Sequence, residues 1–313
     1  MEFPYYTEDE IRQLSECTLC PRECGVNRLR GELGYCNSDA GMNIATICIH
    51  RGEEPVISGP EGICNIFFSG CNLRCVYCQN YEISRPCAGT RFKSPSYEEV
   101  VERIAGMLSG SVKAVGFVSP SHVIPQVKAI IRGLNKKGYK PITVFNTNGY
   151  DKKETIVSLE GLIDVYLPDY KYINASTAEK LSDSPDYPEI AFRAIREMYY
   201  QKGSVLVTDQ EGRAENGLLL RHLVLPGHID ESMKLLGKLA YDISTGINIS
   251  LMSQYHPVAG TSHYPDLDRP LYRSEYTAVV KYMEELGFRK GWIQDMDSHG
   301  NYRPDFSREH PFE

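Results

Sequence analysis

The chain has no run of about 18 apolar residues, so the sequence predicts no helix that crosses a membrane. Its first residues, MEFPYYTEDEIRQL, lack the basic start and the apolar segment of a secretory signal. A surplus of basic residues is also missing, since the formal net charge of the 313 residues is −7. Nucleic-acid binding draws much of its affinity from Lys and Arg contacts to phosphates, so the charge argues against a nucleic-acid partner. These absences predict a cytoplasmic protein without a membrane partner.

Two further absences exclude particular kinds of site. No G-x-G-x-x-G follows an expected strand, which argues against a dinucleotide site of the Rossmann type. A disulfide framework is not expected either, because the chain is long and shows no secretory segment. Ten cysteines are nevertheless present, and seven of them lie in two tight groups. In a reducing, oxygen-limited cytoplasm this pattern indicates metal binding.

Three closely spaced thiols follow a short apolar strand in the segment NIFFSGCNLRCVYCQNY, residues 65–81. Cys71, Cys75 and Cys78 have the spacing C-x3-C-x2-C, and a Ser-Gly turn places them at the carboxyl end of the strand. Three thiolates can ligate three irons of a [4Fe–4S] cluster and leave one iron open to a substrate, because no fourth cysteine follows at ferredoxin spacing. A zinc half-site and a redox dithiol are the alternatives, but zinc sites usually use two such pairs, and a dithiol needs no third thiol upstream.

A second group of thiols lies in the run CTLCPRECGVNRLRGELGYC. Cys17, Cys20, Cys24 and Cys36 have the spacing C-x2-C-x3-C-x11-C, in a segment with too few apolar residues to bury much core. A metal held by these thiols would stabilise the segment. The spacing suits a four-thiolate zinc site and an auxiliary iron–sulfur cluster, and four free thiols are the alternative. Three cysteines are left over and are expected to be buried or incidental, unless one of them joins this site: Cys48, Cys64 and Cys87.

From residue 64 onward, apolar strand patterns alternate with helical patterns. Strands are predicted at 66–69, 114–118, 142–146, 163–168, 218–225 and 247–252. Helices are predicted at 97–108, 123–137, 153–159, 189–202, 231–240 and 274–286. Such alternation produces a parallel sheet with crossover helices, either a barrel or a doubly wound sheet. In a barrel the chemistry lies at the carboxyl ends of the strands, where most of the polar motifs of this chain lie.

Several of these motifs together resemble one family. The segments FFSGCNLRCVYCQN, FNTNGY at 145–150, DYK at 169–171, RHLVLPG at 221–227 and QYHP at 254–257 resemble successive parts of radical S-adenosylmethionine (SAM) enzymes, specifically pyruvate formate-lyase-activating-enzyme-like proteins. The similarity extends from about residue 17 to residue 294. With the strand and helix pattern, it predicts an α/β fold, an open, partial (β/α)6 TIM-like barrel over residues 61–294. A cysteine-rich extension would occupy residues 1–60, and a tail would occupy residues 295–313.

The resemblance also implies an activity. The open iron would bind SAM, and an electron from flavodoxin or ferredoxin would allow SAM to be cleaved to methionine and a 5′-deoxyadenosyl radical. That radical would abstract hydrogen, with a backbone glycine of a protein substrate as the first expectation. Modification of another peptide or of a small metabolite is the alternative. A protein of another class, an electron carrier or a metal-dependent interaction protein, remains open.

Three motifs give candidate SAM contacts beside the thiol loop. The ring or the backbone of Tyr77 is expected to contact the adenine, as in similar loops. The family usually carries a glycine-rich motif after the second strand, where this chain has Ser119 and Pro120, whose carbonyl groups are expected to accept from the SAM amino group. Asn146 replaces an Asp that helps bind a cation in the family, which puts the cation in doubt.

Charged residues near later strand ends complete the candidate site. Asp169 and Lys171 lie two residues apart, hence on one face of an extended chain, where the acid suits ribose or a cation and the lysine suits the SAM carboxylate. Arg221, flanked by apolar residues, needs a buried carboxylate partner, either from a ligand or from the protein itself. His256 is expected to bind ribose or carboxylate, or to cap a turn.

Two further groups of polar residues allow more than one interpretation. His50, Glu53 and Glu54 either face the active site or form a solvated turn. His122 either contacts substrate or caps the following helix.

Overall fold

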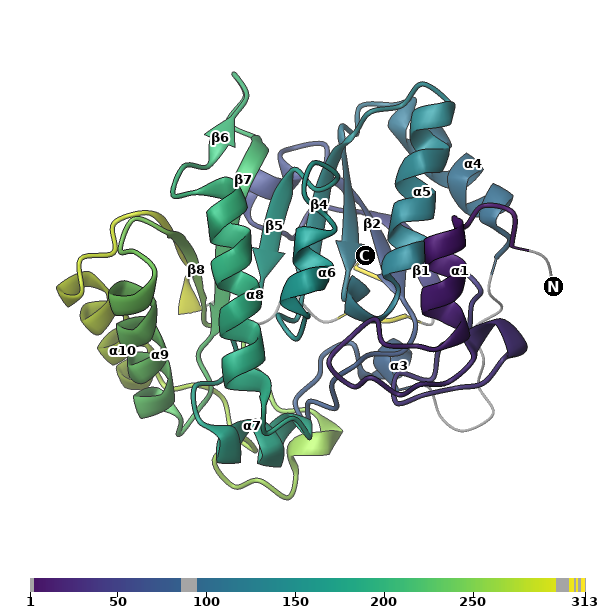
Figure 1. Cartoon of the computed structure of the whole chain (residues 1–313). Helices are drawn as coiled ribbons and strands as arrows, with labels where there is room; N and C mark the ends of the chain where they lie inside the picture. Colours follow the sequence, from purple (N-terminus) through teal and green to yellow (C-terminus); the bar gives the residue numbers. More distant parts are fainter. Residues whose placement is uncertain (1–2, 86–94, 297–303, 307, 309–310, 313) are drawn as a thin grey trace.

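The computed structural model describes residues 3–85, 95–296, 304–306, 308 and 311–312, so Cys87 and part of the expected tail lie outside the described residues. Nine strands of this part form one sheet in the order β1-β2-β3-β4-β5-β7-β8-β9, with β6 paired to β7. The path runs from β1 to β9 without closing. The predicted open barrel is confirmed (Figure 1). Among the helices of the described residues, none combines the length and the apolar character needed to span a membrane.

All six predicted strands are present in parallel register. Their bounds are β2 (Ile63–Phe68), β3 (Ala114–Val118), β4 (Ile142–Thr147), β5 (Val165–Pro168), β7 (Ala214–Leu223) and β8 (Asn248–Met252). Every residue of β2, β3, β5 and β8 is buried, as expected for parallel strands covered on both faces. Three more strands were not predicted: β1 (Ile44–His50), antiparallel to β2; the short β6 (Val207–Thr208), antiparallel to β7; and β9 (Gly291–Ile293), parallel to β8.

The crossover helices cover the outside of the sheet. In Figure 1 the strands run behind α5, α6 and α8. The six predicted helices are α4 (Tyr97–Leu108), α5 (Ile124–Lys136), α6 (Lys153–Val157), α8 (Tyr187–Lys202), α9 (Ile229–Asp242) and α10 (Arg273–Glu285). Short helices occur in addition: α1 (Glu8–Ser15), α2 (Pro55–Ser58), α3 (Tyr81–Ser84), α7 (Ala175–Ser182) and the 3₁₀ turns η1 (Arg28–Arg30), η2 (Pro120–His122) and η3 (Ala259–Thr261).

Helix α4 shows why these segments are helical. The Ser96 hydroxyl accepts from the Glu99 backbone N–H, and the Glu99 carboxylate accepts from the Ser96 N–H, which satisfies two free donors at the helix start. Val100, Val101 and Ile104 then fall on one buried face at helical spacing. The cap fixes where the helix begins, and the apolar face fixes which side packs on the sheet.

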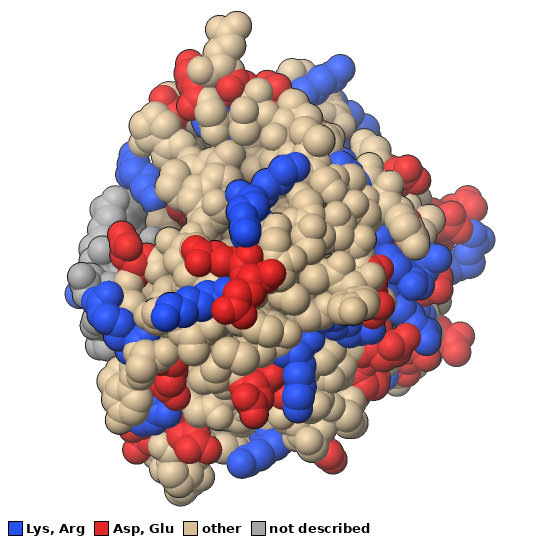
Figure 2. Space-filling view, turned by 90° about the vertical axis from the view of Figure 1, so that its left-hand side faces the viewer, with Lys and Arg blue, Asp and Glu red and all other residues tan. Residues whose placement is uncertain are grey.

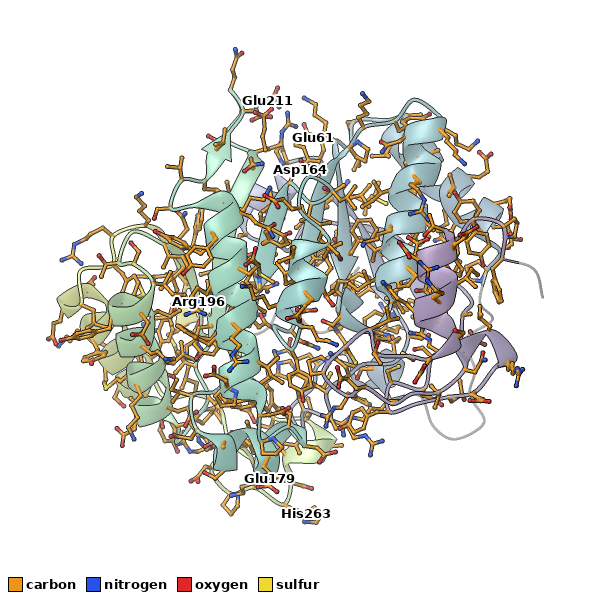
Figure 3. All side chains as sticks on the ribbon, in the orientation of Figure 1. Glu61, Asp164, Glu179, Arg196, Glu211 and His263 are labelled. Carbon is orange, nitrogen blue, oxygen red and sulfur yellow. The ribbon has the colours of Figure 1, made fainter. Side chains whose placement is uncertain are left out.

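Charged residues also lie at the amino ends of the strands, away from the polar motifs at the carboxyl ends, and have a structural role. Glu61, Asp164 and Glu211 lie at the upper end of the molecule in Figure 3, far from α7 and the loop that carries His263. There, Arg213 forms an ion pair with Glu61 at 3.0 Å.

On the face shown in Figure 2, Lys and Arg are interspersed with Asp and Glu, so the described residues of that face form no broad patch of one charge sign.

The amino-terminal segment lies against the carboxyl edge of the sheet, below α5 and beside α3 in Figure 1. The Arg22 Nε donates to the carbonyl of Asn72 at 3.0 Å, and Thr155 Oγ1 donates to the carbonyl of Leu19 at 3.1 Å. Strand β1 precedes residue 60 yet pairs with β2. The proposed domain boundary at residue 60 therefore stays a prediction.

Gly70, just before the thiol loop, lies against the backbone of this segment. It has φ +79, and a Cβ there would overlap the carbonyl oxygen of Cys36. We expect Gly70→Ala to lower the free energy of unfolding by about 3 kcal/mol or more, from the left-handed backbone and the overlap together. Gly161→Ala is the matched control, since Gly161 has φ +75 and nothing within 4 Å of its added Cβ; we expect a loss of about 1 kcal/mol. Equal losses in urea denaturation would show that the contact with Cys36 is unimportant.

Candidate active site

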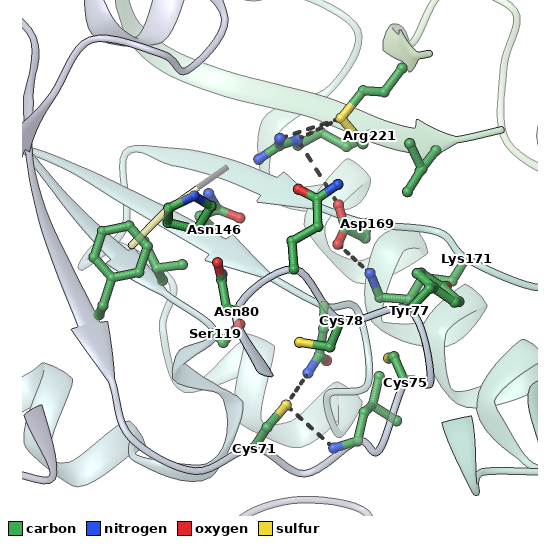
Figure 4. A pocket seen from close by; sticks show the side chains of 18 of the residues that line it. Cys71, Cys75, Tyr77, Cys78, Asn80, Ser119, Asn146, Asp169, Lys171 and Arg221 are labelled. Carbon is green, nitrogen blue, oxygen red and sulfur yellow. Dashed lines mark hydrogen bonds and ion pairs between the residues drawn. The ribbon is translucent and has the colours of Figure 1, made fainter. Parts of the chain in front are cut away.

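A pocket of about 210 Å³ opens at the carboxyl ends of the parallel strands (Figure 4). Its lining brings together most of the residues singled out in the sequence, from five strand ends and from the loop before α2. The predicted residues in the lining are Cys71, Cys75, Tyr77, Cys78, Ser119, Asn146, Asp169, Lys171 and Arg221. His50 and Glu53 also line the pocket, which favours the active-site interpretation of their loop over a solvated turn.

The loop thiols share this pocket and are each hydrogen-bonded. Cys71 Sγ accepts from Asn148 Nδ2 and from the Leu73 N–H, both at 3.4 Å. The Ser182 hydroxyl donates to Cys75 Sγ at 3.0 Å. Ser84 Oγ lies 3.3 Å from Cys78 Sγ. Donors to sulfur stabilise thiolates and tune the potential of iron–sulfur clusters.

The three loop thiols line one pocket, as three ligands of a [4Fe–4S] cluster must. Among the described residues, no group of three or more His, Cys, Asp or Glu side chains is placed to hold a single metal ion. The thiolates of a [4Fe–4S] cluster each bind a different iron, so they need not converge on one point. Burial raises the pKa of Cys71 to about 12, and neighbouring Cys75 adds to the effect. The thiolate form therefore depends on a cationic partner such as iron.

Asp169 and Lys171 form an ion pair at the pocket wall. Lys171 Nζ lies 2.5 Å from Asp169 Oδ2, and both side chains are mostly buried. Burial alone would lower the pKa of Lys171, but Asp169 and the Cys75 thiolate outweigh it, so the pKa is raised. The ammonium therefore stays charged at neutral pH and is available to a carboxylate ligand (Figure 4).

Glu53 connects several strands beneath the pocket. Its Oε1 accepts from Asn65 Nδ2 at 3.0 Å and from Asn146 Nδ2 at 3.2 Å. Its Oε2 lies 3.2 Å from Arg221 Nη1, and Glu54 Oε1 lies 3.3 Å from Arg221 Nε. A carboxylate is thus present beside Asn146 although the family's Asp is missing there. The sequence signal for Glu53 was weak, because an acid pair in a Gly- and Pro-containing loop is equally typical of a solvated turn.

The remaining candidates for SAM contacts, Ser119, Pro120 and His256, lie at or near the edge of the pocket. Ser119 lies in the left-handed region at φ 52, and its N–H donates to the Asn146 carbonyl. The lining, as far as described residues form it, includes neither Pro120 nor His256. His256 Nδ1 lies 3.4 Å from Nε2 of Gln79, which does line the pocket. The ligand contacts proposed for these residues stay predictions.

Two residues have side-chain positions that limit their roles. The Tyr77 hydroxyl accepts from the Tyr172 hydroxyl at 2.7 Å, and the Tyr77 ring packs near Tyr255. The hydroxyl end of Tyr77 therefore contacts the protein core. His122 is buried behind the thiol loop, where its Nε2 lies 3.0 Å from the Ser69 carbonyl. It is therefore a support of the loop rather than part of the described pocket lining.

We expect Asn146→Asp to lower the free energy of unfolding by about 2 kcal/mol at about pH 8, because a donor to Glu53 becomes a second carboxylate. Repulsion raises the folded-state pKa of such an acid pair, so stability is lost as pH rises and the deficit should shrink towards about pH 5. Urea denaturation at both pH values measures this. A double-mutant cycle with Glu53→Gln should show favourable coupling; a deficit that does not change with pH would rule out the repulsion.

A family model described as the radical SAM superfamily matches residues 65–240. Two uncharacterized proteins of Methanocaldococcus jannaschii are similar. MJ0674 is 29% identical over 273 residues, 86% of this chain and 74% of that protein, and MJ0808 is 28% identical over 100 residues, 28% of this chain and 29% of that protein.

Solved structures match this chain at low identity, with TM-scores below 0.5. Streptococcus suis SuiB bound to S-adenosylmethionine matches with a TM-score of 0.48 and 13% identity over 72% of this chain, and the match spans 48% of the SuiB chain, about half its length. A domain of a pyruvate-formate lyase-activating enzyme from Bacteroides vulgatus matches with a TM-score of 0.39 and 15% identity, over 55% of this chain and 93% of that one. The family match covers more than half of the chain, and the chain therefore belongs to the radical SAM superfamily.

Proposed function

We propose that this chain binds a [4Fe–4S] cluster through Cys71, Cys75 and Cys78 and binds SAM in the adjoining pocket. The observation that carries the proposal is that all three thiols line one cavity together with Asp169, Lys171 and Arg221. When bound, a cluster of this superfamily supplies the electron for reductive cleavage of SAM to methionine and a 5′-deoxyadenosyl radical.

We assign different roles in SAM binding to the charged residues of the pocket. The Lys171 ammonium faces the same cavity as the thiols and suits the SAM carboxylate. Asp169 holds Lys171 in place and offers a second oxygen to ribose hydroxyls. Arg221 is already paired with Glu53 and Glu54, so we assign it to positioning these acids rather than to direct SAM binding.

For the substrate, we propose hydrogen abstraction from a backbone glycine of a partner protein, which would generate a glycyl radical. The resemblance of the strand-end motifs to activating enzymes supports this choice. The family has an Asp where this chain has Asn146, and this difference argues against the choice. The Glu53 carboxylate lies beside Asn146, however, and supplies an acid at the same place. We assign the electron donor to the flavodoxin or ferredoxin class, and the compartment to the cytoplasm. Another peptide or a small metabolite is the alternative substrate for the same chemistry.

We expect anaerobically reconstituted protein to release 5′-deoxyadenosine from SAM after reduction by dithionite, measured by chromatography. Cys71→Ala should abolish this release and lower the bound iron, since the variant loses one of three ligands. Cys48→Ala is the matched control, because Cys48 is a buried thiol outside the described pocket lining and should leave release intact. Iron and sulfide without any 5′-deoxyadenosine would instead support an electron carrier.

Lys171→Met tests the SAM contact separately from the cluster. We expect it to retain iron and sulfide while SAM affinity falls by about ten- to a hundredfold, the loss of one charge-assisted bond of about 1.5–3 kcal/mol. The measurement is the SAM-induced change in the electron paramagnetic resonance spectrum of the reduced protein, titrated with SAM. Lys180→Met, an exchange of a lysine outside the described pocket lining, should leave the titration unchanged. Unchanged affinity in Lys171→Met would remove the lysine from the site.

A further inference from the structure

The candidate pocket has a charged wall and an apolar wall. Asp169, Lys171 and Arg221 lie together on one side of it, at the ends of β5 and β7 (Figure 4). The lining from β2 and β3 is apolar and includes Phe67 and Val118. The proposed SAM contacts use the charged wall and the thiol loop. The apolar wall is therefore left for another molecule.

The end of the chain lies against this apolar wall. Pro304 and Phe312 belong to the pocket lining, as far as described residues form it. Phe306 and Phe312 pack on the cluster that contains Phe67 and Val118. The ring centroid of Phe67 lies 5.5 Å from that of Phe306 and 5.6 Å from that of Phe312. Two aromatic side chains of the tail thus occupy the apolar side of the pocket.

The backbone of the tail is attached by contacts that water reaches. The Phe306 N–H donates to Glu82 Oε2 at 3.3 Å, on α3 shortly after the thiol loop, and this bond is exposed. Asp305 pairs with Arg308 at 2.9 Å, and both side chains are well exposed. Exposed polar contacts contribute little to stability, because water replaces them readily. The tail is therefore held mainly by its aromatic side chains, and a competitor for the apolar wall can displace it.

His50 has a polar atom that the tail leaves without a partner. Its side chain is 6% exposed, and its ring centroid lies 4.0 Å from that of Phe312. Burial lowers the pKa of His50, so the imidazole is uncharged at neutral pH. Its buried Nδ1 has no hydrogen-bond partner among the described residues. An unpaired buried polar atom is costly. A ligand with an apolar group and an amide would satisfy this place better than the Phe312 ring does.

We propose that the tail occupies the substrate side of the pocket in the resting protein, and that a peptide substrate with an aromatic side chain displaces it. That side chain takes the place of Phe312 against Phe67, and a backbone amide of the peptide pairs with His50 Nδ1. A peptide carries both groups, which a small polar metabolite lacks. The inference rests on the proposed function and deepens it, since it assigns the substrate class of the same site.

A synthetic peptide with the sequence of residues 304–313, PDFSREHPFE, tests the displacement. The wild-type chain should bind it weakly, because the tail competes in cis at a roughly millimolar effective concentration. We expect the chain with Phe306→Ala and Phe312→Ala to bind the fluorescein-labelled peptide at least about tenfold more tightly, measured by fluorescence anisotropy. Tyr200→Ala with Tyr241→Ala is the matched control, since these aromatic residues of α8 and α9 are 68% and 91% exposed; it should bind like wild type. Equally weak binding by the three chains would overturn the proposal.

Altered ligands identify the groups that bind to the double variant. A peptide with alanine at the position of Phe312 should bind at least about tenfold less tightly. Binding that does not depend on this phenylalanine would exclude an aromatic site. N-acetylphenylalanine methylamide should compete with the labelled peptide, and its competition should weaken by about tenfold when His50→Phe is added, because the ring stays and Nδ1 is lost. Unchanged competition would exclude the amide contact with His50.

Photochemical cross-linking tests the same displacement in a chain that keeps its tail. With Phe312→p-benzoylphenylalanine, irradiation should join residue 312 to β1 or β2, as mapped by mass spectrometry, and excess synthetic peptide should lower the yield. A yield that excess peptide leaves unchanged would show that the tail is a permanent part of the wall. The binding and cross-linking measurements need neither SAM nor a reductant. Failure of SAM cleavage would therefore leave them untouched, and failure of peptide binding would leave SAM cleavage untouched.

Discussion

One arginine forms ion pairs with acidic residues of two other segments at the carboxyl ends of the strands. Arg221, on β7, pairs with Glu53 and Glu54 of the loop before α2 and approaches Asp169 after β5 at 4.0 Å. Buried charges cost several kcal/mol each unless they are paired, so a fold that buries these charges also brings the three segments together. The meeting point is also the floor of the pocket, and the requirement for charge pairing therefore shapes the candidate site.

The thiol loop is held from two sides. Asn148, which lines the pocket, and the buried Ser182 donate to its sulfurs. On the other side, Arg22 donates to the Asn72 carbonyl, and the Cys36 backbone lies against Gly70. A loop with this many backbone supports holds its thiols in fixed positions, which is what ligation of a cluster with one open iron requires. The amino-terminal segment is thus part of the architecture of the site.

Most of the barrel could be predicted because its signals are local. Strand β3 and helix α4 have the bounds expected from the sequence, since one is a short apolar run and the other has a capping box before an apolar face. Strand β1 was missed, because its sequence IATICIH directly follows a Gly- and Asn-containing stretch and its pairing with β2 is a long-range contact. Glu53 was left undecided for the same reason, as its partners lie on β2, β4 and β7.

The sequence by itself determined the alternation of strands and helices, the three-thiol loop at a strand end and the family. Spacing along the chain carries that information, because periodicity and short motifs are read within a few residues. Only the tertiary structure decided which side chains share a pocket and that Glu53 stands beside Asn146. It also showed that the four amino-terminal thiols and the buried Arg28 line one cavity. These relations depend on contacts between residues tens of positions apart, and burial sets their energy, which no local pattern records.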